Sequence, residues 1–289
     1  MKTFKLYKVF VYVALAALAI SIIVPVAWVF VASIKQNSEL YGNPWALPKG
    51  FYFQNFIDAW TKARMGDYLL TSVMVTAVAL LLLLVIALPA SYVLSRFEFV
   101  GRKVLNVAFM AGLFINVNYI VVPIFLMLVG ADRSLSNMGL NGFFLNNPFI
   151  LSLVYAANAL PFTIYLLSGY FQTLPHAYEE AAYIDGAGYL RTMVQIMFPM
   201  ARPAIITIVL FNFLSFWNEY IIAMTLLTDP KGAKTLPVGL LELTQAQNAK
   251  AEFGRLYAGL VLVMLPTLIL YMIVQKKLTQ GMALGGLKG

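Results

Sequence analysis

The chain contains 289 residues, of which 61% are hydrophobic and only 11% are charged. Soluble domains are nearer half apolar and one quarter charged, so this composition excludes an ordinary water-soluble protein and requires a bilayer to cover apolar surface. The absence of cysteine excludes disulfide chemistry, and the single histidine, His176, excludes a multi-histidine metal site. The formal net charge is +8, but the basic residues lie mainly between the apolar runs, which suits membrane topology better than nucleic-acid binding.

Six long apolar stretches predict transmembrane helices of about 20 residues or more. They are residues 9–34, 69–94, 104–129, 149–171, 203–227 and 257–274. The first follows Lys2, Lys5 and Lys8, but it exceeds the ~7–15 apolar residues of a cleavable signal, so we expect a retained anchor. The predicted fold class is therefore an all-α, polytopic membrane protein with six transmembrane helices.

Lysine and arginine residues set the expected orientation, because cytoplasmic loops carry the excess of positive charge. With the N-terminus inside, the cytoplasmic basic residues sit close against the ends of the spans, whereas the external ones are spread through longer loops. Both termini are therefore expected in the cytoplasm. Residues 35–68 then form an external segment, which is either a folded loop or a tether between two spans.

Between the fourth and fifth stretches, residues 172–202 form a helix-prone cytoplasmic segment that is too polar to span the membrane. Pro175 suits a helix start, and the acidic residues after it favour the positive end of a helix dipole. Ala181 and Ile184 belong to a narrow small-and-apolar face, and Gly186 permits a sharp turn after about two helical turns. This pattern alone predicts a short amphipathic helix and leaves open whether a partner binds it.

The same segment resembles the Glu-Ala-Ala loop of permease subunits in binding-protein-dependent ABC importers. The family pattern is Glu-Ala-Ala, three residues, Gly, nine residues, Ile, one residue, Leu and Pro. Matching positions in this chain are Glu180, Ala181, Ala182, Gly186, Ile196 and Pro199, with Phe198 in place of the usual Leu. Four further segments resemble the carbohydrate branch of the family, above all the second permease of maltose-type importers: Asp185-Gly186-Ala187, Trp217-Asn218-Glu219, Lys234-Thr235-Leu236-Pro237-Val238-Gly239 and the tail, residues 281–289.

This resemblance implies a single importer transmembrane domain over residues 1–289 in the cell membrane of a bacterium or archaeon. The chain would form, with a second permease in a heterodimer, the translocation path for a sugar or oligosaccharide delivered by an extracytoplasmic sugar-binding protein. Two partner ATPase subunits would bind ATP and Mg and hydrolyse the ATP, so this chain would hold no cofactor. Its partners would be these proteins and membrane lipid, and it would bind no nucleic acid. The ATPase-coupling residues implied on the cytoplasmic helix are Glu180, Ala181, Ala182, Asp185, Gly186, Ile196 and Pro199.

Polar and aromatic residues inside the apolar stretches are candidates for the translocation path. A carboxylate at the bilayer centre costs roughly 2.5–3.5 kcal/mol on insertion scales, so it normally faces protein or water. Aromatic rings suit the apolar faces of sugars, and amides suit hydroxyls. The alternative role of the same groups is hydrogen bonding and packing between helices. The candidates are Asn116, Tyr119, Asn158, Phe162, Asn212, Phe216 and Glu219.

Residues 228–255 resemble the external loop that reaches into the binding protein's cleft in maltose-type importers. The candidate contacts are Thr244, Gln245, Ala246, Gln247 and Asn248. An ordinary turn followed by a short amphipathic helix is the alternative interpretation.

Motifs for nucleotide binding and catalysis are missing from the sequence, so we expect no enzyme. The segment Gly232-Ala233-Lys234-Thr235 lacks the glycine that a P-loop requires before the lysine, and no Gly-x-Ser-x-Gly elbow occurs. An ion-coupled secondary transporter stays open as an alternative, although such proteins need intramembrane acids and Glu219 is essentially the only deep one. A second alternative is an ABC permease for a non-sugar solute.

Overall fold

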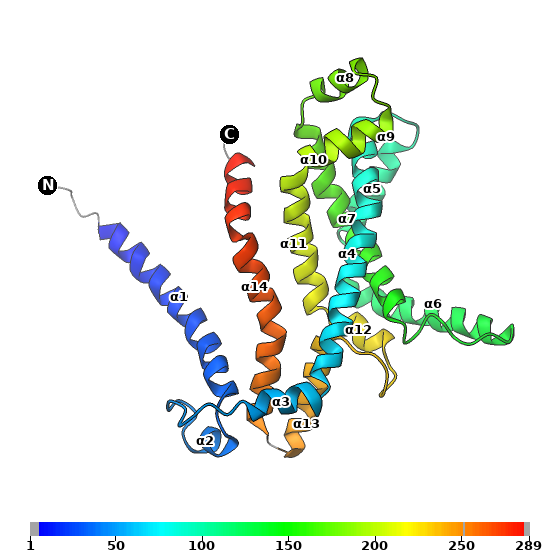
Figure 1. Cartoon of the computed structure of the whole chain (residues 1–289). Coiled ribbons are helices and arrows are strands. Elements are labelled where there is room, and N and C mark those ends of the chain that lie inside the picture. Colours follow the sequence, from blue (N-terminus) through cyan, green and yellow to red (C-terminus); the bar gives the residue numbers. More distant parts are fainter. Residues whose placement is uncertain (1–5, 251, 286–289) are drawn as a thin grey trace. The chain divides into compact units, whose positions relative to one another are not determined.

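The computed structural model describes residues 6–250 and 252–285, and every regular element in this part of the chain is helical (Figure 1). The α-helices are α1 (Leu6–Ser33), α2 (Asn37–Gly42), α3 (Gln54–Thr61), α4 (Met65–Arg96), α5 (Arg102–Gly112), α6 (Val117–Asn137), α7 (Pro148–Thr173), α8 (Ala177–Ile184), α9 (Tyr189–Thr192), α10 (Phe198–Met200), α11 (Arg202–Asn218), α12 (Ile221–Leu226), α13 (Leu236–Lys250) and α14 (Phe253–Gly285). A π-helical turn, η1 (Met193–Met197), lies between α9 and α10. The predicted all-α fold is confirmed.

Within the described residues, five helices are long and apolar enough to cross a membrane: α1, α4, α6, α7 and α14. A sixth candidate is the segment from α9 to α11, in which Tyr189–Met200 and Arg202–Asn218 meet at an angle of 74°. The protein is therefore a multi-pass membrane protein.

Two of the expected stretches are each split into two helices. In residues 104–129, α5 ends at Gly112 and α6 begins at Val117, where the side chain of Asn116 accepts a hydrogen bond from the backbone N–H of Asn118 at 2.9 Å. That bond satisfies one of the free N–H groups at a helix start. In residues 203–227, α11 ends at Asn218 and α12 begins at Ile221. Both breaks are flanked by apolar residues, so hydropathy alone gave no sign of them.

The chain divides into two compact units. The first comprises Met1–Gly66 and Gly239–Pro266, and the second comprises Asp67–Val238 and Thr267–Gly289. None of the most apolar window of α1 is buried, so groups from outside the first unit must cover this helix.

Residues that follow α1 in the first unit form a folded segment and not a loose tether. The side chain of Lys35 is only 1% exposed, and its Nζ donates hydrogen bonds to the carbonyl oxygens of Pro44, at 2.8 Å, and Ala46. The Nδ2 of Asn55 donates to the carbonyl oxygens of Ser33 and Lys35 at 2.9 and 2.8 Å. These bonds satisfy buried backbone acceptors and fix the chain path after α1.

The second unit is organised around α7, which packs against α5, α11 and α12. Several of its side chains, including Leu151, Leu167 and Phe171, are fully buried. Figure 1 shows α8 and the short helices after it at the end of this unit where α7 ends and α11 begins. Residues 172–202 are therefore held between two long helices, as the sequence indicated.

Candidate functional site

The short helix α8 ends in a turn that only glycine adopts without strain. Gly186 has a φ of +75°, and the N–H of Ala187 donates to the carbonyl oxygen of Ala182 at 2.9 Å, which closes the end of the helix. A Cβ added at Gly186 would meet no atom within 4 Å. The requirement for glycine is thus conformational within this chain.

The two faces of α8 differ sharply. Glu180, Ala181 and Ile184 are exposed, and Ile184 retains 86% of its surface. Ala182, in contrast, is 3% exposed, and α8 as a whole packs against α9 and η1. The small-and-apolar face expected for a partner is therefore open.

The other predicted coupling residues also separate by position. Asp185 and Gly186 are exposed at the end of α8, whereas Ile196 and Pro199 are half-buried in η1 and α10. Ala182 is buried and Ile196 and Pro199 are half-buried, so these three residues are less accessible to a partner than the exposed ones.

Glu179 is a site residue that sequence reasoning missed. The hydroxyl of Tyr92 donates to Glu179 Oε1 at 2.8 Å, Arg96 Nε lies 3.5 Å from the same oxygen, and His176 Nδ1 lies 3.1 Å from Oε2. The Arg96 and Glu179 side chains are only 2% and 10% exposed. No local signal could have found it, because the distant residues Tyr92 and Arg96 decide that Glu179 faces inward.

Aromatic rings continue this contact between α8 and the rest of the unit. The Tyr92 ring lies 5.6 Å from both Phe171 of α7 and Phe97, measured between ring centroids, and Phe97 lies 5.6 Å from Tyr189. Tyr189 in turn meets Tyr183 of α8 at 5.8 Å. Burial raises the pKa of Tyr183, so this ring stays neutral and packs as an aromatic group.

A cavity of about 370 Å³ lies between α7, α11 and α12, and five of the seven candidate path residues line it. They are Asn158, Phe162, Asn212, Phe216 and Glu219. The sequence pattern therefore identified residues that do gather in one place. Asn116 and Tyr119 do not belong to it, because Asn116 caps α6 and Tyr119 is 81% exposed on that helix.

Some polar groups that line this cavity are already hydrogen-bonded within the chain and hold its helices together. Glu219 Oε2 accepts from the hydroxyl of Tyr155 at 2.7 Å and from the N–H of Ala223 at 3.1 Å, and Oε1 accepts from the N–H of Ile222 at 2.8 Å. The Nδ2 of Asn212 donates to Thr163 Oγ1 at 3.1 Å. Glu219 and Asn212 thus join α11 to α7 and α12.

Two path candidates remain open to the cavity. Asn158 and Phe162 are exposed side chains on α7, and the Phe162 ring lies 6.3 Å from that of Phe211 on α11 in an edge-to-face contact. An amide and two aromatic edges at one surface suit a ligand with alternating polar and apolar faces.

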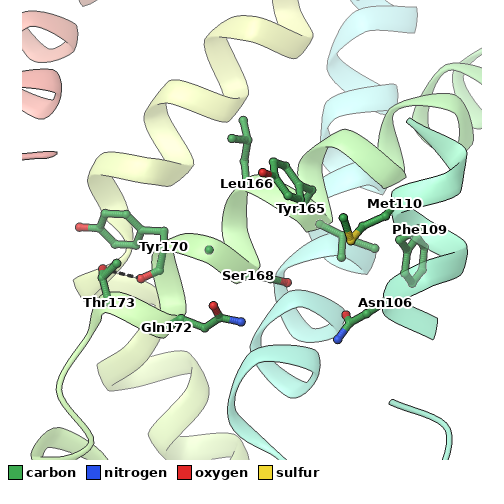
Figure 2. Close-up of a pocket in the computed structure, with 11 residues that line it drawn as sticks. Asn106, Phe109, Met110, Tyr165, Leu166, Ser168, Tyr170, Gln172 and Thr173 are labelled. Carbon is green, nitrogen blue, oxygen red and sulfur yellow. Dashed lines mark hydrogen bonds between the residues drawn. The ribbon is translucent and has the colours of Figure 1, made fainter. Parts of the chain in front are cut away.

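A larger cavity, of about 630 Å³, lies between α5 and α7 and was not predicted. Figure 2 shows Asn106 and Met110 of α5 on one side of it and Ser168 and Gln172 of α7 on the other. The signal in the sequence was the placement of the polar residues Asn106, Ser168 and Gln172 within or beside apolar stretches.

The candidate external contacts lie on α13. Thr244, Gln245 and Ala246 are exposed there. The side chains of Gln247 and Asn248 lie outside the described part of the structure.

Comparison with known proteins gives consistent matches over most of the chain. The family described as "Binding-protein-dependent transport system inner membrane component" matches residues 87–284. A diacetylchitobiose uptake system permease protein of Streptomyces coelicolor is 37% identical over 267 residues, which cover 92% of this chain and 84% of the relative. A trehalose/maltose transport system permease protein of Thermococcus litoralis is 27% identical over 292 residues, covering 98% of each chain.

A solved structure agrees with these sequence relatives. A chain in the crystal structure of a bacterial ABC transporter involved in the import of the acidic polysaccharide alginate superimposes with a TM-score of 0.77 at 25% identity. The match covers 96% of this chain and 98% of that one.

Proposed function

Because this chain belongs to the family of binding-protein-dependent transport system inner membrane components, we propose that it is a transmembrane permease subunit of an ABC importer for a sugar or oligosaccharide. It forms the translocation path together with a second permease, and a solute-binding protein delivers the cargo from outside. Relatives described as permeases for diacetylchitobiose and for trehalose/maltose support a carbohydrate as the solute.

The observation that carries the proposal is the geometry of α8. This helix presents an exposed face of Glu180, Ala181 and Ile184, ends at the positive-φ Gly186, and is held between two long helices. Small side chains let a partner surface approach closely, so a partner ATPase is the expected occupant. In this arrangement α8 and both termini are cytoplasmic, and ATP and Mg bind to the two ATPase subunits and not to this chain.

The test is reconstitution of the complete importer in proteoliposomes, with MgATP enclosed and the binding protein outside. Labelled diacetylchitobiose, trehalose, maltose and melibiose are offered separately, the last because a further relative is described as a melibiose/raffinose/stachyose import permease protein. We expect uptake of at least one sugar, with ATP hydrolysis stimulated by the loaded binding protein. Uptake by this chain without an ATPase partner, or a complex that no sugar stimulates, would refute the proposal.

The cavity beside Phe162 is proposed as part of the translocation path. Phe162→Ala should lower the uptake rate at least threefold at limiting sugar, because an aromatic contact with the solute is lost while Phe162 is already 40% exposed and adds little to packing. Phe10→Ala provides the matched control, since Phe10 is 75% exposed on α1 outside the cavity. Equal uptake by the two variants would remove Phe162 from the path.

The exposed residues of α13 are proposed as the contact with the binding protein, with Thr244, Gln245, Ala246, Gln247 and Asn248 as its candidate residues. Ala246→Trp adds a bulky ring at an exposed position, so stimulation by the loaded binding protein should fall at least fivefold. Assembly with the ATPase should not change, because it occurs elsewhere. Normal stimulation in an assembled Ala246→Trp complex would favour an ordinary surface helix.

A further inference from the structure

The end of α4 is attached to α8 by a buried ionic cluster. Arg96, in the last turn of α4, donates from Nη2 to the carbonyl oxygen of Leu174 at 2.6 Å and pairs through Nε with Glu179 Oε1 at 3.5 Å. Leu174 lies just before α8 and Glu179 lies in its first turn. One guanidinium therefore holds both the entry to the helix and the helix itself.

We propose that Glu179 is a positioning residue that transmits the movement of α8 to α4, and this inference rests on the proposed function. Chain connections link α8 directly to α7 on one side and to η1 and α11 on the other. The partners Tyr92 and Arg96 lie more than 80 residues earlier in the sequence, so the backbone gives α8 no short route to α4. Glu179 supplies that route.

Both oxygens of the Glu179 carboxylate are engaged, which makes the joint directional. Oε1 accepts from Tyr92 and faces Arg96, while Oε2 meets His176, whose Nε2 lies 3.1 Å from Arg96 Nη1. The Arg96 and Glu179 side chains are 2% and 10% exposed, and a charged acceptor in such a buried position makes stronger hydrogen bonds than a neutral one. A load on α8 is therefore passed to the last turn of α4.

Packing fixes the receiving end of this joint. The Tyr92 side chain is 2% exposed and its ring meets Phe97 and Phe171 edge-on. Its hydroxyl cannot follow Glu179 without moving the ring, and the ring cannot move without displacing α4. Removing the hydroxyl oxygen of Tyr92 breaks the Tyr92–Glu179 hydrogen bond and leaves the packed ring in place.

The experiment measures sugar taken up per ATP hydrolysed by the complete importer in proteoliposomes, with whichever of the four labelled disaccharides gives the highest wild-type uptake. Tyr92→Phe removes the hydroxyl, and Glu179→Gln keeps an acceptor but loses the charge opposite Arg96. We expect each variant to assemble normally, to keep its basal ATP hydrolysis, and to lose at least threefold in uptake per ATP. The double variant should lose less than the product of the two single losses, because both changes weaken one joint.

Matched controls make the same chemical changes elsewhere. Glu98→Gln removes a carboxylate that is 93% exposed just after α4 and pairs with Arg102, and Tyr12→Phe removes a hydroxyl from a residue that is 72% exposed on α1. Both should keep the wild-type ratio of uptake to hydrolysis.

Three outcomes overturn the inference. The first is a wild-type ratio in assembled Tyr92→Phe and Glu179→Gln complexes, and the second is a loss of assembly and hydrolysis in parallel, which would make the cluster merely structural. Both leave the proposed function intact as long as the wild-type complex couples uptake to hydrolysis. The third is a wild-type complex without sugar-stimulated hydrolysis, which would overturn the proposed function as well.

Discussion

Replacing Gly186 by aspartate should abolish sugar-stimulated ATP hydrolysis while leaving membrane insertion intact. Gly186 lies at the exposed end of α8, so the added carboxylate would be desolvated beneath a docked ATPase. Burying an unpaired charge is among the most costly single changes a protein surface can carry. The measurement is basal and stimulated ATP hydrolysis of the purified complex, together with the amount of ATPase subunit that copurifies.

Two further variants at the same position separate charge from backbone conformation. Gly186→Asn has nearly the shape of Gly186→Asp and tolerates a φ of +75°, so it should retain a measurable part of the stimulation. Gly186→Val is sterically excluded from this conformation and should displace the end of α8, with a loss of tenfold or more. Wild-type stimulation in the aspartate variant would show that no partner covers this end of α8.

Ala182→Asp would not report on the same contact. Ala182 is 3% exposed within the chain, so a carboxylate there would be buried before any partner bound. The residue belongs to the Glu-Ala-Ala pattern, but the structure places it on the buried side of α8. Only the position of the neighbouring helices distinguishes it from the exposed Ala181.

Features that depend on local sequence were predictable. The first apolar stretch, residues 9–34, corresponds closely to α1 (Leu6–Ser33), because hydropathy and length alone determine such a helix. The end of α8 was predictable from Gly186, because the need for a positive φ is a property of one residue.

Features that depend on distant residues were not predictable. Which of Glu179 and Glu180 points inward is decided by Tyr92 and Arg96, and nothing near α8 in the sequence indicates that the end of α4 lies there. Lys35 begins the segment expected to be external, and the sequence does not indicate that its amino group is buried among carbonyl oxygens of the residues that follow it. Periodicity gives the faces of a helix but not their neighbours.

The candidate path shows the same division. Asn158 and Phe162 are four residues apart in a helical stretch, so a common face was predictable, and both line one cavity. Hydropathy could not reveal the break after Asn218, where Glu219 becomes the acceptor for the first turn of α12. The carboxylate of Glu219, the one deep acid in the apolar stretches, thus has a structural role at the start of α12.

Replacing Glu219 by leucine should lower the thermal stability of the permease, because Glu219 mainly holds helices together. The substitution leaves three donors without an acceptor: the Tyr155 hydroxyl and the N–H groups of Ile222 and Ala223. Each unsatisfied buried donor costs about 1–3 kcal/mol, so the total loss should reach about 3 kcal/mol or more. The midpoint of thermal unfolding of the detergent-solubilised complex should fall clearly below that of the wild type.

Glu219→Gln and Tyr155→Phe test whether this loss comes from the hydrogen bonds. Glutamine keeps one acceptor oxygen, so Glu219→Gln should lose only about 1 kcal/mol, and Tyr155→Phe removes a donor together with its need for a partner. Adding Tyr155→Phe to Glu219→Leu should therefore restore part of the lost midpoint, because one of the three unsatisfied donors disappears. If Glu219 acted mainly on the solute, Glu219→Gln would instead reduce uptake at an unchanged midpoint, and the Tyr155→Phe change would restore nothing. A partial restoration of the midpoint by Tyr155→Phe would show that the Glu219 carboxylate joins α7, α11 and α12 through these hydrogen bonds.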